Sequence, residues 1–529
     1  KVNIISIAYL PEIKIENFLV TELNDLPDCL AFQDFYYFNK ISQEISAYFK
    51  RKDFSVRMDD LLRKVIMLKL APEYLLVIPE KNFDSTVLDI SDEEVRIDDY
   101  KVFDLEPDQV KIINDIKPGH YLMLANAGSG KSVILLSKAI KLSQKNPSKK
   151  VLLTCFNTNL ADVYKFKRDF AGINQGNLFI MTFHKLVLDY INQNFDVRFR
   201  LEQFDDALTF LEQKIRENKI KVRFIGIFID ETQIFEPRWI DICYLLLETP
   251  PQSNYFSLAG DLSQDVRKTT KSRKASWQLA KQIPEPKFRG RVKYLNKNYR
   301  NSAEISAFLN NYLLKVKNVL ETVGYTTDKD FDAEVLGISI RKGTPVRYTI
   351  TDRFKECKVV VEIIRKLHEE HKLNYNEIAI IFPYRQHKAI NYYPHVWIKE
   401  LLDKDSIPYS EIFKMEEGLR TKVYNVEGLV ISTIESSLGL DFKAVILFGL
   451  LPFGYSFSRI NGKQFSKQSL GTVIDFKKQK DQEKIEDFKN YCNLIYTGCS
   501  RARDYLFVVN SLEKTALISQ VLEPNNKKG

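Results

Sequence analysis

A glycine-rich stretch between two apolar segments constrains this chain more than any other feature. Residues 121–124 form an apolar, strand-like run, and residues 133–139 form an apolar run compatible with a helix. A strand, a tight turn and a helix N-terminus together offer a phosphate chain free backbone N–H groups, a positive dipole end and a lysine. The sequence therefore predicts a phosphate-binding P-loop, which comprises Ala125, Asn126, Ala127, Gly128, Ser129, Gly130, Lys131 and Ser132.

Individual positions of the P-loop predict its chemistry. Gly128 and Gly130 let the backbone wrap tightly around phosphate oxygens. Lys131 would reach the β- and γ-phosphates, and the Ser132 hydroxyl would ligate magnesium. Ala125 stands where such loops usually have their first glycine. We therefore expect ATP and Mg²⁺ as ligands.

Two carboxylates follow the apolar run at residues 224–229. A carboxylate at the end of a buried strand is costly unless a metal or cation pairs with it, so Asp230 beside Ser132 would hold magnesium. Glu231 is placed to orient or deprotonate the attacking water. A third predicted strand ends just before Gln264, which is placed to sense the γ-phosphate.

Further side chains suit the base and the transferring phosphate of a nucleotide. Gln109 precedes the P-loop, and its amide carries both a donor and an acceptor, which suits the N6 and N7 edge of adenine. Tyr299 is expected to stack on adenine, and Arg300 offers an always-charged guanidinium for a γ-phosphoryl group. Arg501 lies near the start of a final predicted strand, where the alternative is a surface arginine at a helix end.

Predicted strands alternate with helix-like stretches in both halves of the chain, which favours parallel α/β sheets. In the second half, strands are expected at residues 346–351, 377–382, 429–433, 445–450 and 505–509. We expect an N-terminal domain at residues 1–100, a first P-loop domain at 101–280 and a second domain at 281–529.

Residues 1–100 favour a small mixed domain with a strand at residues 74–78, but they indicate no clear function. An Asp-x-Lys triplet at residues 99–101, with Asp84 and Asp89 upstream, has the spacing of a restriction-type nuclease metal site. Because this triplet is common by chance and lies in an acidic, linker-like stretch, a nuclease is the weaker interpretation.

Charge and aromatic residues indicate a polyanion partner. The net charge is +9, which is compatible with nucleic acid. Residues 267–297 are strongly basic, with Trp277 and Phe288 interleaved, so the segment is either a solvated loop or a nucleic-acid contact. Phe156 and Phe183 end two predicted strands and are either core residues or faces on which bases stack.

The composition disfavours several other classes. The six cysteines lack the paired spacing of a zinc site or a disulfide framework. No apolar run approaches the roughly 18 residues that a membrane helix needs, and the chain does not open with a signal peptide. We therefore expect no membrane partner and a cytoplasmic location.

Taken in order, these segments resemble the UvrD/Rep-like branch of superfamily 1 DNA helicases, including variants with Thr-Phe-His and Asn-Tyr-Arg signatures. The resemblance runs from Gln109 to about Val509 and leaves residues 1–100 outside it. It implies an α/β fold of two RecA-like P-loop domains with parallel sheets. The small α+β N-terminal domain that residues 1–100 favour would precede them. ATP would bind between the two RecA-like domains.

The resemblance also implies roles for single residues. Arg300 and Arg501 would act across the nucleotide site as arginine fingers, and Asp441 would lie near the ribose. Single-stranded DNA would cross the top of both domains, against Phe156, Asn157, Thr182, Phe183, His184 and Thr433.

The chain departs from the family's pattern in several places. Residues 435–439 lack the usual His and Lys, residues 265–268 lack a base-stacking tryptophan, and residues 133–134 lack the arginine often found past the P-loop. The short spacing between Lys131 and Asp230 predicts reduced accessory subdomains. Such a compact variant is better equipped to translocate than to unwind duplex alone.

The leading interpretation is an ATP-dependent DNA translocase or helicase that acts on single-stranded DNA or a tailed duplex, with 3′ to 5′ travel implied by the resemblance. The alternative is a nucleic-acid-stimulated ATPase switch in a larger assembly, such as a bacterial phage-defence complex, with a protein partner or nuclease as effector. The altered residues 435–439 and the N-terminal domain favour this alternative. An RNA-directed enzyme is a third interpretation.

Overall fold

The computed structural model describes most of the chain from residue 107 onward and four short strands before it. The described residues are 8–10, 30–32, 75–79, 100–104, 107–125, 128–170, 176–220, 222–248, 254–261, 275–285, 287–288, 290–295, 297–325, 338–339, 341–385, 392–413, 426–450, 476–478, 480–512 and 516–523. The chain forms two compact units, residues 1–75 with 96–98 and residues 76–95 with 99–529. Both large sheets belong to the second unit.

The first large sheet is six-stranded and parallel, in the order β10-β5-β9-β8-β6-β7. Its strands in chain order are β5 (Gly119–Ala125), β6 (Val151–Cys155), β7 (Leu178–Thr182), β8 (Gly226–Ile229), β9 (Tyr255–Gly260) and β10 (Val292–Leu295). All residues of β6 and β8 are buried. Strands buried on both faces favour continuous apolar runs, which is what these segments contain.

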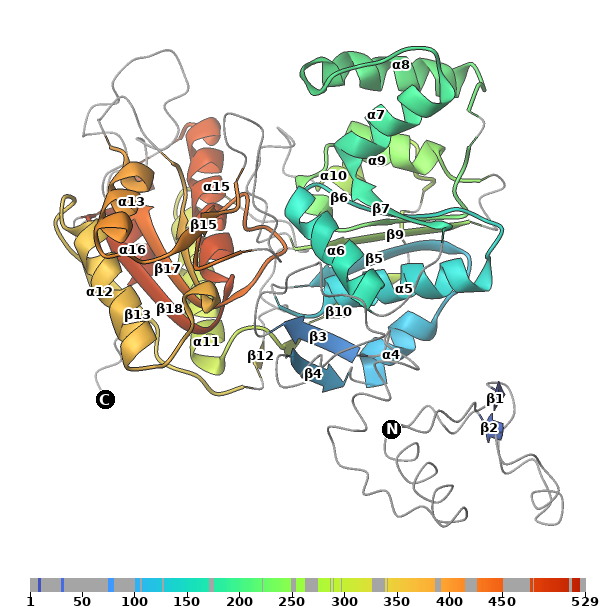
Figure 1. Ribbon diagram of the computed structural model, residues 1–529. Coiled ribbons are helices and arrows are strands. Elements are labelled where there is room, and N and C mark those ends of the chain that lie inside the picture. Colours follow the sequence, from blue (N-terminus) through green and yellow to red (C-terminus); the bar gives the residue numbers. More distant parts are fainter. Residues whose placement is uncertain are drawn as a thin grey trace, which may run out of the picture. The chain divides into compact units, whose positions relative to one another are not determined.

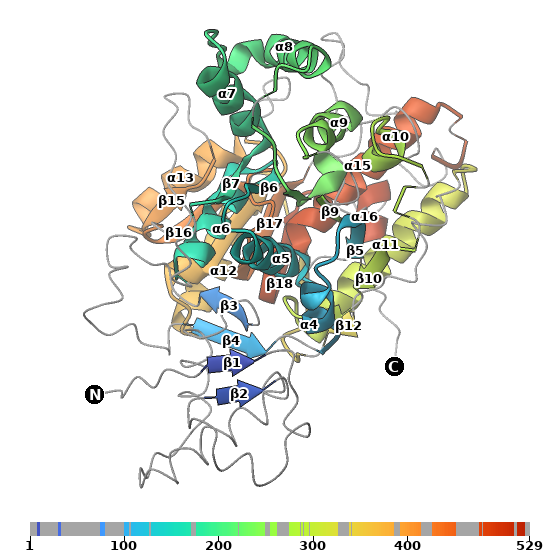
Figure 2. The same ribbon diagram turned by 90° about the vertical axis from the view of Figure 1, so that its right-hand side faces the viewer.

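Helices connect the parallel strands of the first sheet, since such strands need long crossovers. α5 joins β5 to β6, and α6 joins β6 to β7. In both views, α7 and α8 stand together above this sheet (Figures 1 and 2). The helices are α4 (Pro107–Asn114), α5 (Lys131–Lys145), α6 (Thr158–Phe170), α7 (Phe183–Asn194), α8 (Phe204–Arg216), α9 (Pro237–Leu245) and α10 (Ser276–Leu279), with 3-10 turns η6 (Leu201–Gln203) and η7 (Thr232–Ile234).

The second large sheet is also six-stranded and parallel, in the order β13-β18-β17-β14-β16-β15. Its strands are β13 (Arg347–Ile350), β14 (Ile378–Phe382), β15 (Tyr409–Glu411), β16 (Leu429–Thr433), β17 (Phe442–Leu450) and β18 (Ala502–Asn510). Its helices are α11 (Ala303–Glu321), α12 (Glu356–Glu369), α13 (Pro394–Lys404), α15 (Gln482–Cys499) and α16 (Leu517–Leu522), with the 3-10 turn η12 (Tyr375–Glu377).

Three two-stranded pairs complete the described elements. They are β1 (Ala8–Leu10) with β2 (Leu30–Phe32), β3 (Leu75–Pro79) with β4 (Tyr100–Asp104), and β11 (Lys297–Asn298) with β12 (Ile338–Ser339). The β1–β2 and β11–β12 pairs are parallel.

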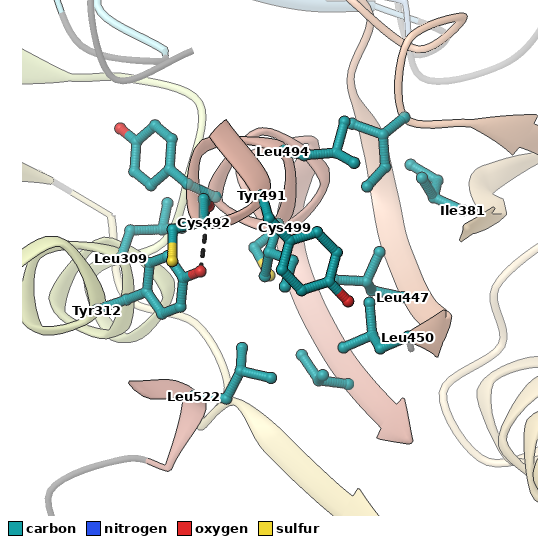
Figure 3. Close-up of a cluster of buried hydrophobic side chains, with 14 of the residues drawn as sticks. Leu309, Tyr312, Ile381, Leu447, Leu450, Tyr491, Cys492, Leu494, Cys499 and Leu522 are labelled. Atoms are coloured by element: carbon teal, nitrogen blue, oxygen red, sulfur yellow. Dashed lines mark hydrogen bonds between the residues drawn. The ribbon is translucent and has the colours of Figure 1, made fainter. Parts of the chain in front are cut away.

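The largest buried cluster lies between α11, α15 and the second sheet. Figure 3 shows Leu309 and Tyr312 of α11 beside α15, with Leu447 and Leu450 of β17 in the same cluster. The Tyr312 hydroxyl donates a hydrogen bond to the carbonyl oxygen of Cys492, at 3.1 Å. Burial of each large apolar side chain contributes roughly 1.5–3 kcal/mol, so this cluster ties both helices to the sheet.

The fold confirms the expected α/β class, with two parallel sheets consistent with two RecA-like domains. All five strands expected in the second half of the chain are present, as β13, β14, β16, β17 and β18. β3 lies within one residue of the strand expected at 74–78. The expectation of an α+β domain at residues 1–100 otherwise falls outside the described residues.

The sequence does not predict β10 and β15. Both are short strands at sheet edges, and β10 is half exposed, so neither has a continuous apolar run. β10 pairs with β5, so the first sheet extends beyond residue 280, where we expected the first domain to end. The division into domains at residues 100 and 280 stays a prediction.

Candidate functional site

The P-loop connects β5, which ends at Ala125, to α5. Gly128 and Gly130 have φ angles of 78° and 84°, a left-handed region that a residue with a side chain adopts only at a cost. Gly130 is the N-cap of α5, so the first N–H groups of this helix face the loop. Asn126 and Ala127 lie outside the described residues.

A segment from far along the chain packs directly on the P-loop. The backbone N–H of Tyr299 donates a hydrogen bond to the carbonyl oxygen of Gly128, at 2.9 Å. A Cβ atom added at Gly128 would lie 2.3 Å from Asn298 Oδ1 and 2.7 Å from Arg300 Cβ. The structure thus places the expected arginine finger Arg300 and the expected adenine contact Tyr299 beside the phosphate loop.

The two expected magnesium ligands meet at the start of α5. The Ser132 hydroxyl donates to Asp230 Oδ2 at 2.6 Å, and the Tyr164 hydroxyl donates to the same oxygen. Asp230 is fully buried, and burial, followed by the neighbouring Glu231 carboxylate, raises the pKa of Asp230. A buried carboxylate and a hydroxyl are hard oxygen donors that suit Mg²⁺, so these residues fit the cation.

Glu231 is held in a strained backbone conformation beside Lys131. Its φ angle is 54°, which is uncommon for a residue with a side chain and is one of the strained conformations that recur at active sites. Lys131 Nζ lies 3.6 Å from Glu231 Oε1, and both side chains are buried. Although burial acts to raise the pKa of Glu231, the charges of Lys131 and Arg501 bring it below its usual value. The carboxylate is therefore charged and able to accept a proton.

Gln233, which the sequence does not single out, links Glu231 to the end of β9. Its amide Nε2 donates to Glu231 Oε2, and its Oε1 accepts from the backbone N–H of Asp261 at 3.1 Å. Gln233 is buried, so both bonds are shielded from solvent. Gln264, the residue expected to sense the γ-phosphate, lies outside the described residues.

Gln109 lies against the P-loop, from its place on α4. Its Nε2 donates to the carbonyl oxygen of Ser129 at 3.2 Å, and a Cβ atom at Gly130 would lie 2.9 Å from the same nitrogen. The structure thus brings Gln109 to the phosphate loop, and its contact with adenine stays a prediction.

Asp441 lies among basic side chains. Its carboxylate oxygens are 3.4 Å from Arg300 Nε and 3.7 Å from Arg503 Nε. Burial alone would raise the pKa of Asp441, but Arg300 and Arg503, with the Lys167 ammonium nearby, lower it. Asp441 therefore neutralises and orients Arg300, and its expected place near the ribose stays a prediction.

Arg501 is buried and held by backbone carbonyls. Its Nε donates to Thr497 O at 3.0 Å, and a terminal nitrogen donates to Leu440 O at 3.3 Å. Burial, followed by repulsion from Arg300, lowers the pKa of Arg501 to about 10. The alternative of a surface arginine at a helix end is therefore wrong, because the side chain is only 1% exposed.

The two arginine segments are joined by Asn301, another residue that the sequence does not single out. Its side-chain amide donates to the carbonyl oxygen of Ser500 at 3.0 Å and to that of Ala502. Asn301 is fully buried. The segments that carry Arg300 and Arg501 are therefore hydrogen-bonded to each other and are not two independent loops.

The residues expected to contact DNA beside the first sheet differ in their exposure and contacts. Phe183 is fully buried and stacks on Trp239, with ring centroids 5.0 Å apart, so the expectation that it stacks on a base is wrong and it is a core residue. Phe156 and His184 are partly exposed at the same aromatic cluster. The Thr182 hydroxyl caps α7 by accepting from the backbone N–H of Lys185 at 3.3 Å.

The residues expected to contact DNA also include Asn157 and Thr433. They lie where the segment after β6 of the first sheet meets the segment after β16 of the second sheet. The Asn157 amide donates to the carbonyl oxygens of Glu435, at 3.1 Å, and Ser436, at 3.3 Å. The neighbouring Asn159 donates to Ser436 O at 2.8 Å. The Thr433 hydroxyl bonds within its own loop, to the Ser436 hydroxyl at 3.0 Å.

Two other expectations concern aromatic and metal-binding residues. Trp277 and Phe288 are buried in the hydrophobic cluster of the first sheet, so they do not provide exposed rings for bases. Much of the basic segment 267–297 lies outside the described residues. In the part of the chain that the structure describes, there is no group of three His, Cys, Asp or Glu residues arranged to hold a metal. The side chains of the nuclease-like triplet at residues 99–101 are not described.

The chain contains two parallel sheets connected by helices. A P-loop follows β5 of the first sheet, and a segment from the second half of the chain that carries arginines lies beside it. This arrangement defines the RecA-like class of proteins. Residues 105–317 match the family model described as UvrD/REP helicase N-terminal domain. The chain thus carries a UvrD/REP helicase N-terminal domain, and the resemblance to UvrD/Rep-like superfamily 1 helicases is confirmed.

This match supports an ATP-dependent DNA helicase activity, and helicases of this family generally use ATP with Mg²⁺ and bind DNA. A search of curated proteins finds no match to the chain. Among the described residues, no helix combines the length and the apolar character needed to cross a membrane.

Proposed function

We propose that the chain is an ATP-dependent translocase or helicase on single-stranded DNA. The observation that supports this most is the convergence of Lys131, Ser132 and the Asp230–Glu231 pair at the P-loop, with the Arg300 segment bonded to Gly128. These groups come from both halves of the chain, which is the arrangement that a nucleotide-driven motor needs.

In this proposal, nucleotide binding begins at the P-loop. Lys131, which pairs with Glu231 in the structure, would exchange that partner for the β- and γ-phosphates of ATP. Ser132 and Asp230 would hold Mg²⁺, whose charge offsets that of the phosphate oxygens. Gln109 and Tyr299 would contact the adenine, and Asp441 would lie near the ribose.

Hydrolysis would depend on Glu231. A charged carboxylate within reach of the γ-phosphate can accept a hydrogen bond from water and take its proton, which contributes roughly 10²–10⁴-fold to the rate. The bond from Gln233 to Glu231 fixes the carboxylate for this task. Arg300 and Arg501 would neutralise charge on the transferring γ-phosphoryl group, and Gln264 would sense the γ-phosphate.

The motor would act along the DNA backbone. Phe156 and His184, which are partly exposed, would stack on or contact bases, while Thr182, Asn157 and Thr433 would line the strand. Alternating grip by the two RecA-like domains would move the chain, with 3′ to 5′ travel expected from the family. Such contacts carry no base-specific readout, so no sequence preference is expected.

A second candidate function is an ATPase switch within a larger assembly, such as a bacterial phage-defence complex, with a protein partner or nuclease as effector. The contacts of Asn157 with the carbonyl oxygens of Glu435 and Ser436 favour it, because a side chain expected to contact DNA is instead bonded within the chain. Asn159 donates to the same Ser436 oxygen. In either case we propose that the chain acts on DNA in the cytoplasm.

ATP hydrolysis and strand displacement by the purified chain test the proposal together. We expect single-stranded DNA to stimulate hydrolysis strongly, with displacement on a 3′-tailed duplex and none on a 5′-tailed control. Stimulation without displacement would support the switch. Equal stimulation of ATP hydrolysis by RNA and by DNA would contradict DNA specificity. An ATP hydrolysis rate that is the same with and without nucleic acid would contradict both candidate functions.

A further inference from the structure

A buried tyrosine hydroxyl on α6 points to the expected magnesium site. Tyr164 is 1% exposed and lies outside every motif described above. Its hydroxyl donates to Asp230 Oδ2, the oxygen that also accepts from Ser132. Since α6 follows β6 and Asp230 directly follows β8, the contact joins the chain segments after two neighbouring strands of the first sheet.

Asp230 is fixed at both of its carboxylate oxygens. Oδ1 accepts the backbone N–H of Glu231 at 2.8 Å, while Oδ2 accepts the two hydroxyls of Ser132 and Tyr164. A carboxylate can rotate about its last torsion, which is broad, so these bonds select one orientation. The Ser132 hydroxyl, in the first turn of α5, sits on a short side chain that can change its χ1 rotamer, whereas the Tyr164 oxygen is carried by a buried aromatic ring.

We propose that Tyr164 is a positioning residue for the magnesium-binding carboxylate, an inference that rests on the proposed nucleotide site. Its hydroxyl holds Asp230 Oδ2 beside Ser132 Oγ, so that both oxygens face the cation together. Residues that hydrogen-bond a metal ligand typically contribute about 10–100-fold to metal affinity. Tyr164 therefore sets the Mg²⁺ concentration that the chain needs, and it does so without contacting the nucleotide.

The Tyr164→Phe variant tests this, because it keeps the ring and removes only the hydroxyl. The readout is binding of the fluorescent nucleotide mant-ADP while Mg²⁺ is titrated. We expect the midpoint Mg²⁺ concentration to rise about 10–100-fold, while the affinity for mant-ADP in EDTA stays at the wild-type value. Tyr164→Met removes the hydroxyl with different packing, and we expect the same shift.

Tyr312→Phe is the matched control. Tyr312 is equally buried, and its hydroxyl donates to Cys492 O at 3.1 Å in the other core. We expect its Mg²⁺ midpoint to equal that of the wild type. A rise of the midpoint in all three variants, or a loss of affinity in EDTA, would assign Tyr164 a general role in folding and overturn the inference.

The two proposals fail in distinguishable ways. If the wild-type chain binds mant-ADP with Mg²⁺ and Tyr164→Phe has the same midpoint, the inference is wrong and the proposed function stands. If Mg²⁺ does not affect mant-ADP binding by the wild-type chain, the inference is wrong. If the wild-type chain binds mant-ADP neither with Mg²⁺ nor in EDTA, the proposed function is wrong and the inference falls with it.

Discussion

Replacing Gly128 with alanine adds one methyl group where the P-loop meets the segment that carries Arg300. The φ angle of Gly128 is 78°, which an alanine rarely adopts. The new Cβ would lie 2.3 Å from Asn298 Oδ1 and 2.7 Å from Arg300 Cβ, closer than non-bonded atoms approach. We therefore expect residues 298–300 to move away from the loop.

The expected cost has two parts. A left-handed backbone costs an alanine about 1–2 kcal/mol. Displacing packed neighbours adds about 1–3 kcal/mol, so the free energy of unfolding should fall by about 2–5 kcal/mol. Because the displaced segment carries Arg300, we also expect ATP hydrolysis to slow by up to about 10³-fold.

Gly290→Ala isolates the close approach from the backbone strain. The φ angle of Gly290 is 73°, and among the described residues a Cβ there would meet no atom within 4 Å. Urea unfolding should thus show a loss of only about 1–2 kcal/mol, with hydrolysis unchanged. If Gly128→Ala is no less stable than Gly290→Ala and hydrolyses ATP at the wild-type rate, residues 298–300 do not pack on the P-loop as described.

Three further predictions follow from burial and hydrogen bonding. Phe183→Ala should lower the free energy of unfolding, measured with urea, by about 3–5 kcal/mol. Phe156→Ala should mainly weaken single-stranded DNA binding, by about 1–3 kcal/mol in a fluorescence titration. The reverse pattern would contradict the buried position of Phe183 and the partly exposed position of Phe156. Asn301→Ala should lower the free energy of unfolding by about 1–3 kcal/mol for each buried carbonyl left unpaired. It should also slow ATP hydrolysis, because the segment that carries Arg501 loses its bonds to Asn301. Unchanged stability and hydrolysis rate would show that the Arg300 and Arg501 segments are independent. Burial raises the pKa of Glu356 to about 7, although hydrogen bonds to its carboxylate lower it. Between pH 4.5, the usual pKa of a glutamate, and about pH 7, Glu356 is protonated in the folded state but ionised in the unfolded state. The free energy of unfolding should therefore fall as pH rises through this range. Urea titrations of Glu356→Gln should lack this slope, and a slope equal to the wild type's would refute the assignment.

The strands and the P-loop could be predicted because their signals are local. Continuous apolar runs mark strands buried on both faces, and residues 125–132 carry their chemistry within one turn. β10 and β15 are short and only partly buried, and each includes polar or charged residues, so neither contains a continuous apolar run. The family resemblance, built on the order of several motifs, holds for the same reason.

Side-chain placement depended on partners far along the chain. Phe156 and Phe183 both follow a strand, and both stack on Trp239 of α9. Phe183 also packs on Phe204 and Phe235 and is fully buried, whereas Phe156 is partly exposed. Tyr164 belongs to no motif, and its role depends on a contact with Asp230, 66 positions away. Such contacts are products of the fold and leave no local pattern to detect.

The central claim is that the residues at the P-loop hydrolyse ATP in response to single-stranded DNA. The most direct test compares DNA-stimulated hydrolysis by the wild-type chain and by Glu231→Gln, with mant-ATP binding measured on both. We expect strong stimulation in the wild type, a loss of roughly 10²–10⁴-fold in the variant, and retained nucleotide binding. Hydrolysis at the wild-type rate by Glu231→Gln, or no hydrolysis by the wild-type chain with DNA present, would contradict the account.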